Sequence, residues 1–122
     1  MKILIIKEHT MNLTINKENG ISYIKLNQEK ATLNDSLDFR EKVLAHIEKE
    51  NANKIVVDFE NVEFVDSSFL GALTICLKKV TEKMGDIRVT NLTPPVRVMF
   101  ELTRLYKVFE VFDNNLDAIE SF

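Results

Sequence analysis

Two adjacent serines, Ser67 and Ser68, are the residues of this chain whose setting most favours chemistry. They follow Asp66 where a strand-like pattern gives way to a helix-like one, so we expect them in the first turn of a helix. The first backbone N–H groups of a helix lack partners, and the helix dipole places partial positive charge there. A phosphate on a serine would be well accommodated at such a position, and it would bring about two negative charges. In the alternative interpretation, the polar residues only cap the helix.

Other reactions find little support in the sequence. A serine nucleophile would need a neighbouring base and an oxyanion hole, but His9 lies in the N-terminal arm and His46 lies well along a predicted helix. The G-x-S-x-G elbow is absent. With one cysteine, Cys76, and three scattered glycines, the chain has neither a Cys/His metal cluster nor a glycine-rich phosphate loop. We therefore expect a protein that is not an enzyme and has no cofactor or metal site.

Hydrophobic periodicity predicts the elements that must position the serines. The predicted strands are residues 12–16, 21–26, 54–59, 86–90 and 108–112. The predicted helices are residues 33–49, residues 67–84 with Gly85 as a stop, a helix that starts at Thr93 and Pro94, and a last turn near the C-terminus. The apolar positions are Leu33, Leu37, Phe39, Val43, Leu44 and Ile47 in the first helix, and Leu70, Leu73, Leu77, Val80 and Met84 in the second.

The order of these elements implies an α/β fold, in which helices pack on a mixed sheet. A chain of 122 residues is long enough to bury a core as one domain without a disulfide or metal. We expect residues 11–122 to form this domain. Residues 1–10 are expected to be an N-terminal extension, either an extra strand or a loosely attached arm.

Charge and composition restrict the partners and the compartment. A net charge of −3 gives no basic footprint for a nucleic acid, and it weakly opposes binding to anionic membranes. The apolar run of residues 3–6 is too short for a signal peptide or for membrane insertion. A single cysteine suits a reducing compartment. We therefore expect a cytoplasmic protein that binds neither nucleic acid nor the membrane interior.

The segment VVDFENVEFVDSSFLGALTICLKKV, residues 56–80, resembles the STAS-domain anti-sigma factor antagonists. In that family a buried strand and a short loop precede Asp-Ser-Ser-Gly-Leu-Gly, which opens a helix. The resemblance extends from about residue 11 through most of the chain, and it includes NLTPPVRVMFELTRLYKVFEVF near the C-terminus. It implies a single STAS-like domain with a mixed sheet of about four to five strands and about four helices.

The resemblance also implies a regulatory function. Unmodified members bind an anti-sigma factor that has a serine-kinase-type ATP-binding fold, and this binding frees a sigma factor. The anti-sigma factor then phosphorylates the first serine of the pair, which ends the binding, and a serine phosphatase resets the protein. By position, Ser67 is the expected phosphorylation site, and Ser68 is its competitor. The expected partner-binding residues are Asp66, Ser67, Ser68, Phe69, Leu70 and Gly71, in which Leu70 anchors the helix on the core and Gly71 permits close packing or close approach of a partner.

The chain departs from the family pattern at Phe69 and in the loop after the second strand, in addition to its N-terminal extension. Phe69 stands where the family usually has glycine, and either a core position or an exposed anchor for a partner would explain it. The loop of residues 27–32 lacks the glycine and carboxylate that the family shows there. These departures would suit an alternative function, that of a constitutive STAS accessory subunit of a transporter ATPase, with no phosphorylation cycle.

Overall fold

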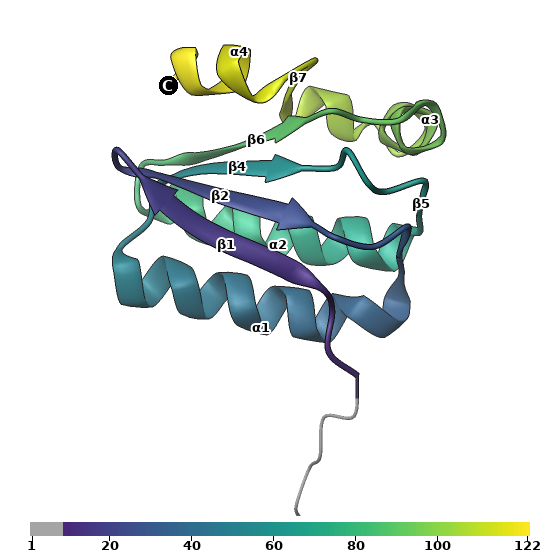
Figure 1. Cartoon of the computed structure of the whole chain (residues 1–122), viewed down its shortest axis with the longest axis horizontal. Helices are drawn as coiled ribbons and strands as arrows, with labels where there is room; N and C mark the ends of the chain where they lie inside the picture. The colour runs from purple at the N-terminus through teal and green to yellow at the C-terminus, as the bar shows by residue number, and fades with distance from the viewer. Residues whose placement is uncertain (1–8) are drawn as a thin grey trace, which may run out of the picture.

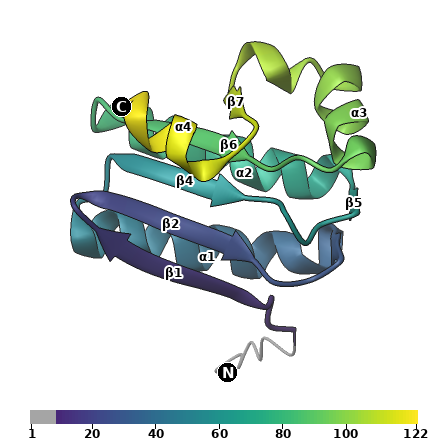
Figure 2. The same ribbon diagram turned by 45° about the horizontal axis from the view of Figure 1, so that its top comes forward.

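The computed structural model of the protein describes residues 9–122, in which helices cover both faces of a sheet (Figures 1 and 2). The strand order is β1 (Leu13–Glu18), β2 (Ile21–Leu26), β4 (Lys54–Asp58), β6 (Asp86–Thr90) and β7 (Glu110–Phe112). β1 is antiparallel to β2, and the other neighbouring strands are parallel. The predicted mixed sheet is therefore confirmed. Of the predicted N-terminal extension, residues 1–8 lie outside the described residues.

The helices form two layers around this sheet. α1 (Leu33–Glu50) and α2 (Ser67–Glu82) lie side by side on one face, and the short α4 (Asn115–Glu120) covers part of the other (Figure 1). α3 (Pro94–Leu102) and the 3-10 turn η1 (Leu105–Lys107) connect β6 to β7. The main core lies between the sheet and the α1–α2 layer.

The predicted apolar face of α1 is only partly right. Phe39, Val43 and Ile47 are fully buried, whereas Leu33 and Leu37 are 66% and 48% exposed. A helix that lies on a sheet buries one stripe of side chains, and apolar residues off that stripe remain in water. Leu33 and Leu37 are one turn apart and therefore share a face that the domain leaves uncovered.

The end of α2 also differs from the prediction. The helix ends at Glu82, and Met84 is 94% exposed instead of belonging to the apolar stripe. Met84 takes a left-handed φ of 59°, the conformation that ends many helices. Gly85 follows it, and a Cβ at Gly85 would collide with the backbone carbonyl of Asn53. The glycine is therefore needed for the close approach of another segment and not for its own φ.

A short pairing between two loops positions the serines. β3 (Lys30–Ala31) runs parallel to β5 (Phe64–Val65), and the N–H of Asp66 extends this pairing by donating to the carbonyl of Ala31 at 3.3 Å. As a result, α1 and α2 begin at the same corner of the molecule (Figure 1).

Candidate functional site

Asp66 joins the starts of the two long helices. As the N-cap of α2, it accepts a hydrogen bond from the N–H of Phe69 through Oδ1 at 2.9 Å. Its other oxygen, Oδ2, accepts from the N–H of Leu33, the first residue of α1, at 2.8 Å. One carboxylate therefore satisfies donors that two helices would leave unpaired. This arrangement fixes the backbone from which Ser67 and Ser68 project.

Ser67 and Ser68 are the first two residues of α2, and both are exposed. Within residues 9–122, neither hydroxyl has a hydrogen-bond partner, and neither backbone N–H has an acceptor. Free N–H groups and the positive end of the dipole make this end of α2 favourable for an anion. A phosphate on either serine would therefore gain donors without breaking a described contact. We call Asp66, Ser67 and Ser68 the serine corner.

Phe69 belongs to the core, so its interpretation as an exposed anchor for a partner is wrong. Its side chain is fully buried, and its ring centroid lies 4.8 Å from that of Phe39. Asp66 caps the N–H of Phe69 and thereby sets the first turn of α2. In that turn the two serines face solvent and Phe69 faces α1 and the sheet.

The next two residues differ in their exposure. Leu70 is buried, so its side chain anchors α2 and does not lie at the surface. Gly71 is exposed, and a Cβ there would meet no atom within 4 Å. The fold itself therefore does not require a glycine at this position, and the surface of α2 beside the serines is open.

Three exposed apolar side chains lie near the serine corner. The sequence did not predict that they would be exposed. Phe64, two residues before Asp66, is 50% exposed, while its neighbour Val65 is buried. Leu33, whose N–H binds Asp66, and Leu37 form the exposed face of the first turns of α1. We call Leu33, Leu37 and Phe64 the apolar rim. Large apolar groups left in water beside a polar corner are typical of a surface that binds another protein.

The loop that departs from the family pattern is held by contacts within the fold. Gln28 accepts from the N–H of Asn12 at 2.8 Å and donates to the carbonyl of Lys30 at 2.7 Å. The N–H of Thr32 donates to the carboxylate of Asp35 at 2.9 Å. These residues brace the starts of β1 and α1.

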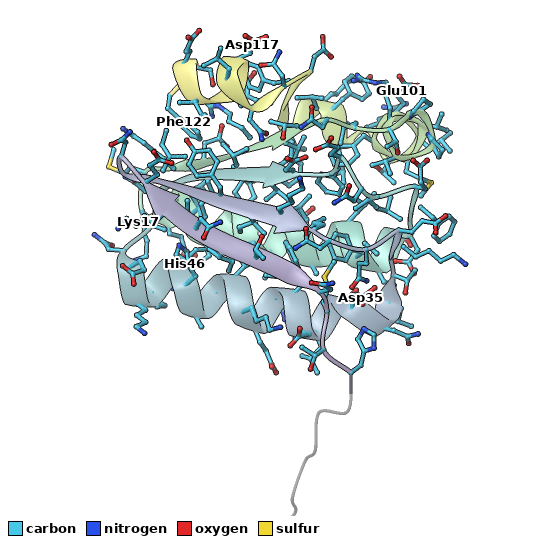
Figure 3. All side chains as sticks on the ribbon, in the orientation of Figure 1. Lys17, Asp35, His46, Glu101, Asp117 and Phe122 are labelled. Carbon is cyan, nitrogen blue, oxygen red and sulfur yellow. The ribbon has the colours of Figure 1, made fainter. Side chains whose placement is uncertain are left out.

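Among residues 9–122, neither His9 nor His46 makes a hydrogen bond to Ser67 or Ser68. His46 lies in the second half of α1, whereas Asp35 marks the start of that helix (Figure 3). His46 bonds to the hydroxyl of Ser22 at 2.7 Å, and burial lowers the pKa of its imidazole. Burial raises the pKa of the Cys76 thiol to about 12, which leaves it protonated and unreactive. Among residues 9–122, no group of three or more His, Cys, Asp or Glu side chains could hold a metal ion, and no helix has the length and apolar character needed to span a membrane.

Comparison with known proteins identifies the family of this domain. Residues 12–118 match the family model of the STAS domain. The chain belongs to the STAS domain family. The match includes the serine corner and the apolar rim, so both lie within the STAS domain itself.

Several relatives of this STAS domain have names that describe regulators. The anti-sigma F factor antagonist of Paenibacillus polymyxa is 28% identical over 111 residues, which cover 89% of this chain and 94% of the relative. An anti-sigma factor antagonist of Mycobacterium paratuberculosis has a similar structure, with a TM-score of 0.80, 20% identity, and coverage of 92% of this chain and 93% of its own. The Bacillus cell fate determinant SpoIIAA in its phosphorylated form gives a TM-score of 0.69 at 18% identity, with coverage of 90% and 98%. At these identities the two structures show a shared fold.

Proposed function

We propose that this protein is an anti-sigma factor antagonist that is switched off by phosphorylation of Ser67. The observation that carries the proposal is the exposed start of α2, where the serine hydroxyls and N–H groups have no partner among the described residues. The name of the Paenibacillus polymyxa relative supports the proposal. Further support comes from SpoIIAA, a protein of the same fold that exists in unphosphorylated and phosphorylated forms.

In this proposal the protein is a binding module of the cytoplasm and not an enzyme. Unphosphorylated, it binds an anti-sigma factor with a serine-kinase-type ATP-binding fold and so frees a sigma factor. The same partner transfers a phosphoryl group to Ser67, and a serine phosphatase removes it.

The surface proposed for this partner consists of the serine corner, Gly71 and the apolar rim. The rim would supply buried apolar contact at the centre, where most binding energy of an interface resides. The serines would lie beside it as neutral polar groups. Phe69 and Leu70 support this surface from beneath, because both are buried in the core.

Phosphorylation would act on this surface through charge. A dianion in an interface that fitted a neutral hydroxyl must be desolvated without a matching cation, which costs several kcal/mol. A loss of about 4 kcal/mol weakens binding about a thousandfold. The fold of the free protein would be preserved, since the phosphate lies at the favourable end of α2.

The proposal distinguishes Ser67 from Ser68 by the family pattern, since both are exposed in the first turn. The test is mass spectrometry after incubation with ATP and the candidate serine kinases of the same genome. We expect a single phosphate on the wild type, the same phosphate on Ser68→Ala, and none on Ser67→Ala.

Binding to the cognate anti-sigma factor completes the test. Ser67→Ala should bind constitutively, whether or not ATP is present. Ser67→Asp should bind weakly, although one carboxylate mimics a phosphate dianion imperfectly. If no kinase modifies Ser67 and Ser67→Asp binds as tightly as the wild type, the switch is wrong and a constitutive subunit takes its place.

A further inference from the structure

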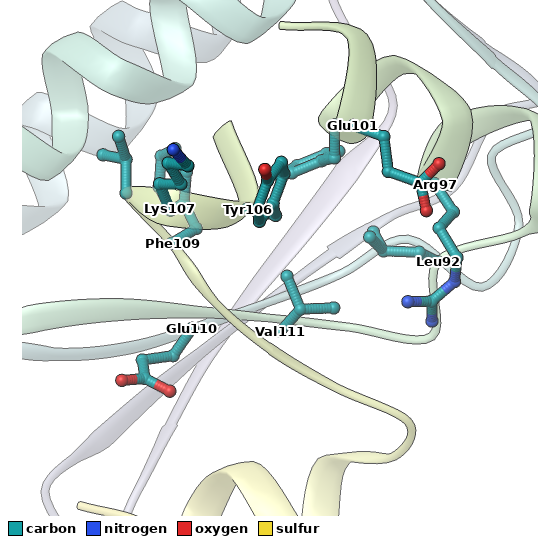
Figure 4. A pocket seen from close by; sticks show the side chains of 10 residues that line it. Leu92, Arg97, Glu101, Tyr106, Lys107, Phe109, Glu110 and Val111 are labelled. Atoms are coloured by element: carbon teal, nitrogen blue, oxygen red, sulfur yellow. The ribbon is translucent and has the colours of Figure 1, made fainter. Parts of the chain in front are cut away.

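A pocket of about 680 Å³ lies at the β7 edge of the sheet, between α3, η1 and β7 (Figure 4). Leu92, Phe100 and Phe109 are buried and form its apolar floor with the half-buried Val111. Tyr106 and Val108, each about half exposed, form its lip. A pocket of this size takes one or two large apolar side chains. It shares no residue with the serine corner or the apolar rim.

The strand beside this pocket has an open edge. Within residues 9–122, β7 pairs only with β6. The carbonyl of Phe112 faces β6, since it accepts from the N–H of Asn91 at 3.2 Å. Successive residues of a strand turn their backbone groups to opposite sides, so the N–H and C=O of Val111 face outward. Such an edge is a template for another strand.

The charges around the pocket favour a cationic segment. Glu101 and Glu110 line the pocket and have no ion pair among the described residues. Of the two cationic lining residues, Arg97 is paired with Asp113 at 3.6 Å, and Lys107 has no ion pair among the described residues, so two carboxylates stand against one unpaired cation. An extended segment with apolar side chains in its centre and a lysine at each end would match the apolar floor and the two carboxylates.

The chain contains one such segment outside the described residues. Residues 3–6 are Ile-Leu-Ile-Ile, flanked by Lys2 and Lys7, and β-branched residues favour an extended strand. We propose that residues 2–7 of a second copy of this chain add as a strand to the outer edge of β7 and place an apolar side chain in the pocket.

The segment must come from a second copy because its own domain is too wide. The chain leaves the domain at the opposite side, where His9 bonds to Asp35 and the N–H of Met11 bonds to Asp38 at 2.8 Å. β1 and β7 are the two outermost of five strands, which places them about 19 Å apart. With residues 3–6 on β7, the three steps of chain from residue 6 to His9 would span at most about 11 Å.

Sedimentation velocity of the full chain over a range of concentrations tests the proposal. The wild type should self-associate. Ile5→Asp in the segment should weaken the association at least about tenfold, as should Val111→Pro, which removes the outward N–H of the edge strand at a position where proline is tolerated. Absence of self-association in the wild type, or association unchanged by both variants, overturns the proposal.

A charge exchange keeps the test independent of folding defects. Glu110→Lys should weaken association, and Lys7→Glu in the same chain should restore it. Glu120→Lys is the matched control, an exposed charge reversal on α4, and should leave association unchanged. A failure of Lys7→Glu to restore association counts against the proposed pairing.

A synthetic peptide of residues 1–8, added to the full chain carrying Ile5→Asp, locates the contact by NMR. We expect the amide signals of residues 109–112 to shift. Shifts confined to the first turns of α1 would show that the segment lies there instead and would overturn the proposal. None of these outcomes depends on Ser67, so the phosphorylation switch can fail while this proposal holds.

Discussion

At the residue scale, Asp66 differs from an ordinary helix cap because each of its carboxylate oxygens holds the start of a different helix. We predict that Asp66→Ala lowers the free energy of unfolding by about 2 kcal/mol, since it removes the cap of α2 and the acceptor of the first N–H of α1. The control is Asn114→Ala, which removes the N-cap of α4 alone and should cost about 1 kcal/mol. Urea denaturation measures both. Equal losses would contradict the double role of Asp66.

Two phenylalanines show which residue-scale features the sequence predicts. The serine-bearing helix start is predictable because Asp-Ser-Ser is a local capping signal. The environments of Phe64 and Phe69 are not, because a single apolar residue at the edge of an element does not define which face is buried. The structure exposes Phe64 by 50% and buries Phe69 completely. The difference arises from the β3–β5 pairing, which depends on a distant segment, and from the Asp66 cap, which sets the first turn of α2.

At the element scale, periodicity predicts the long helices but not which of their apolar residues are buried. α1 carries both a buried stripe and an exposed pair, Leu33 and Leu37. The sheet against which α1 packs determines which of these apolar residues are buried. β3 and β5 have two residues each, too few for any period to be visible. The geometry of the serine corner depends on these two short strands, so it could not be derived from sequence.

The end of α2 gives a prediction at the same scale. Gly85→Ala should lower the free energy of unfolding by about 1–3 kcal/mol, because the new Cβ meets the backbone of Asn53 and not a movable side chain. Met84→Gly, one residue earlier, should raise it by roughly 1 kcal/mol, since Met84 is exposed and left-handed. Thermal denaturation of both variants checks the pair. If Gly85→Ala left the melting temperature unchanged, the segment around Asn53 would have to be able to move.

At the scale of the whole molecule, the sheet topology brings the site together. Successive parallel strands share their carboxyl ends, and the helices that follow them start there. The additional β3–β5 pairing then sets the starts of α1 and α2 at one corner. The pocket beside β7 lies at one edge of the sheet, where α3 and η1 cross over. The domain therefore presents two separate surfaces, one proposed for the anti-sigma factor and one for a second copy.

The separation of surface from core gives the last prediction. Leu33→Ala and Phe64→Ala should each weaken binding to the cognate anti-sigma factor about tenfold and leave the melting temperature nearly unchanged, since both side chains are half exposed or more. Phe69→Ala should instead cost about 3–5 kcal/mol of stability, because it opens a cavity beside α1. Leu116→Ala, an exposed leucine on α4, should change neither quantity. Calorimetric titration and thermal denaturation of the same four variants separate these effects. Unchanged affinity for both Leu33→Ala and Phe64→Ala would mean that the partner binds elsewhere on the domain.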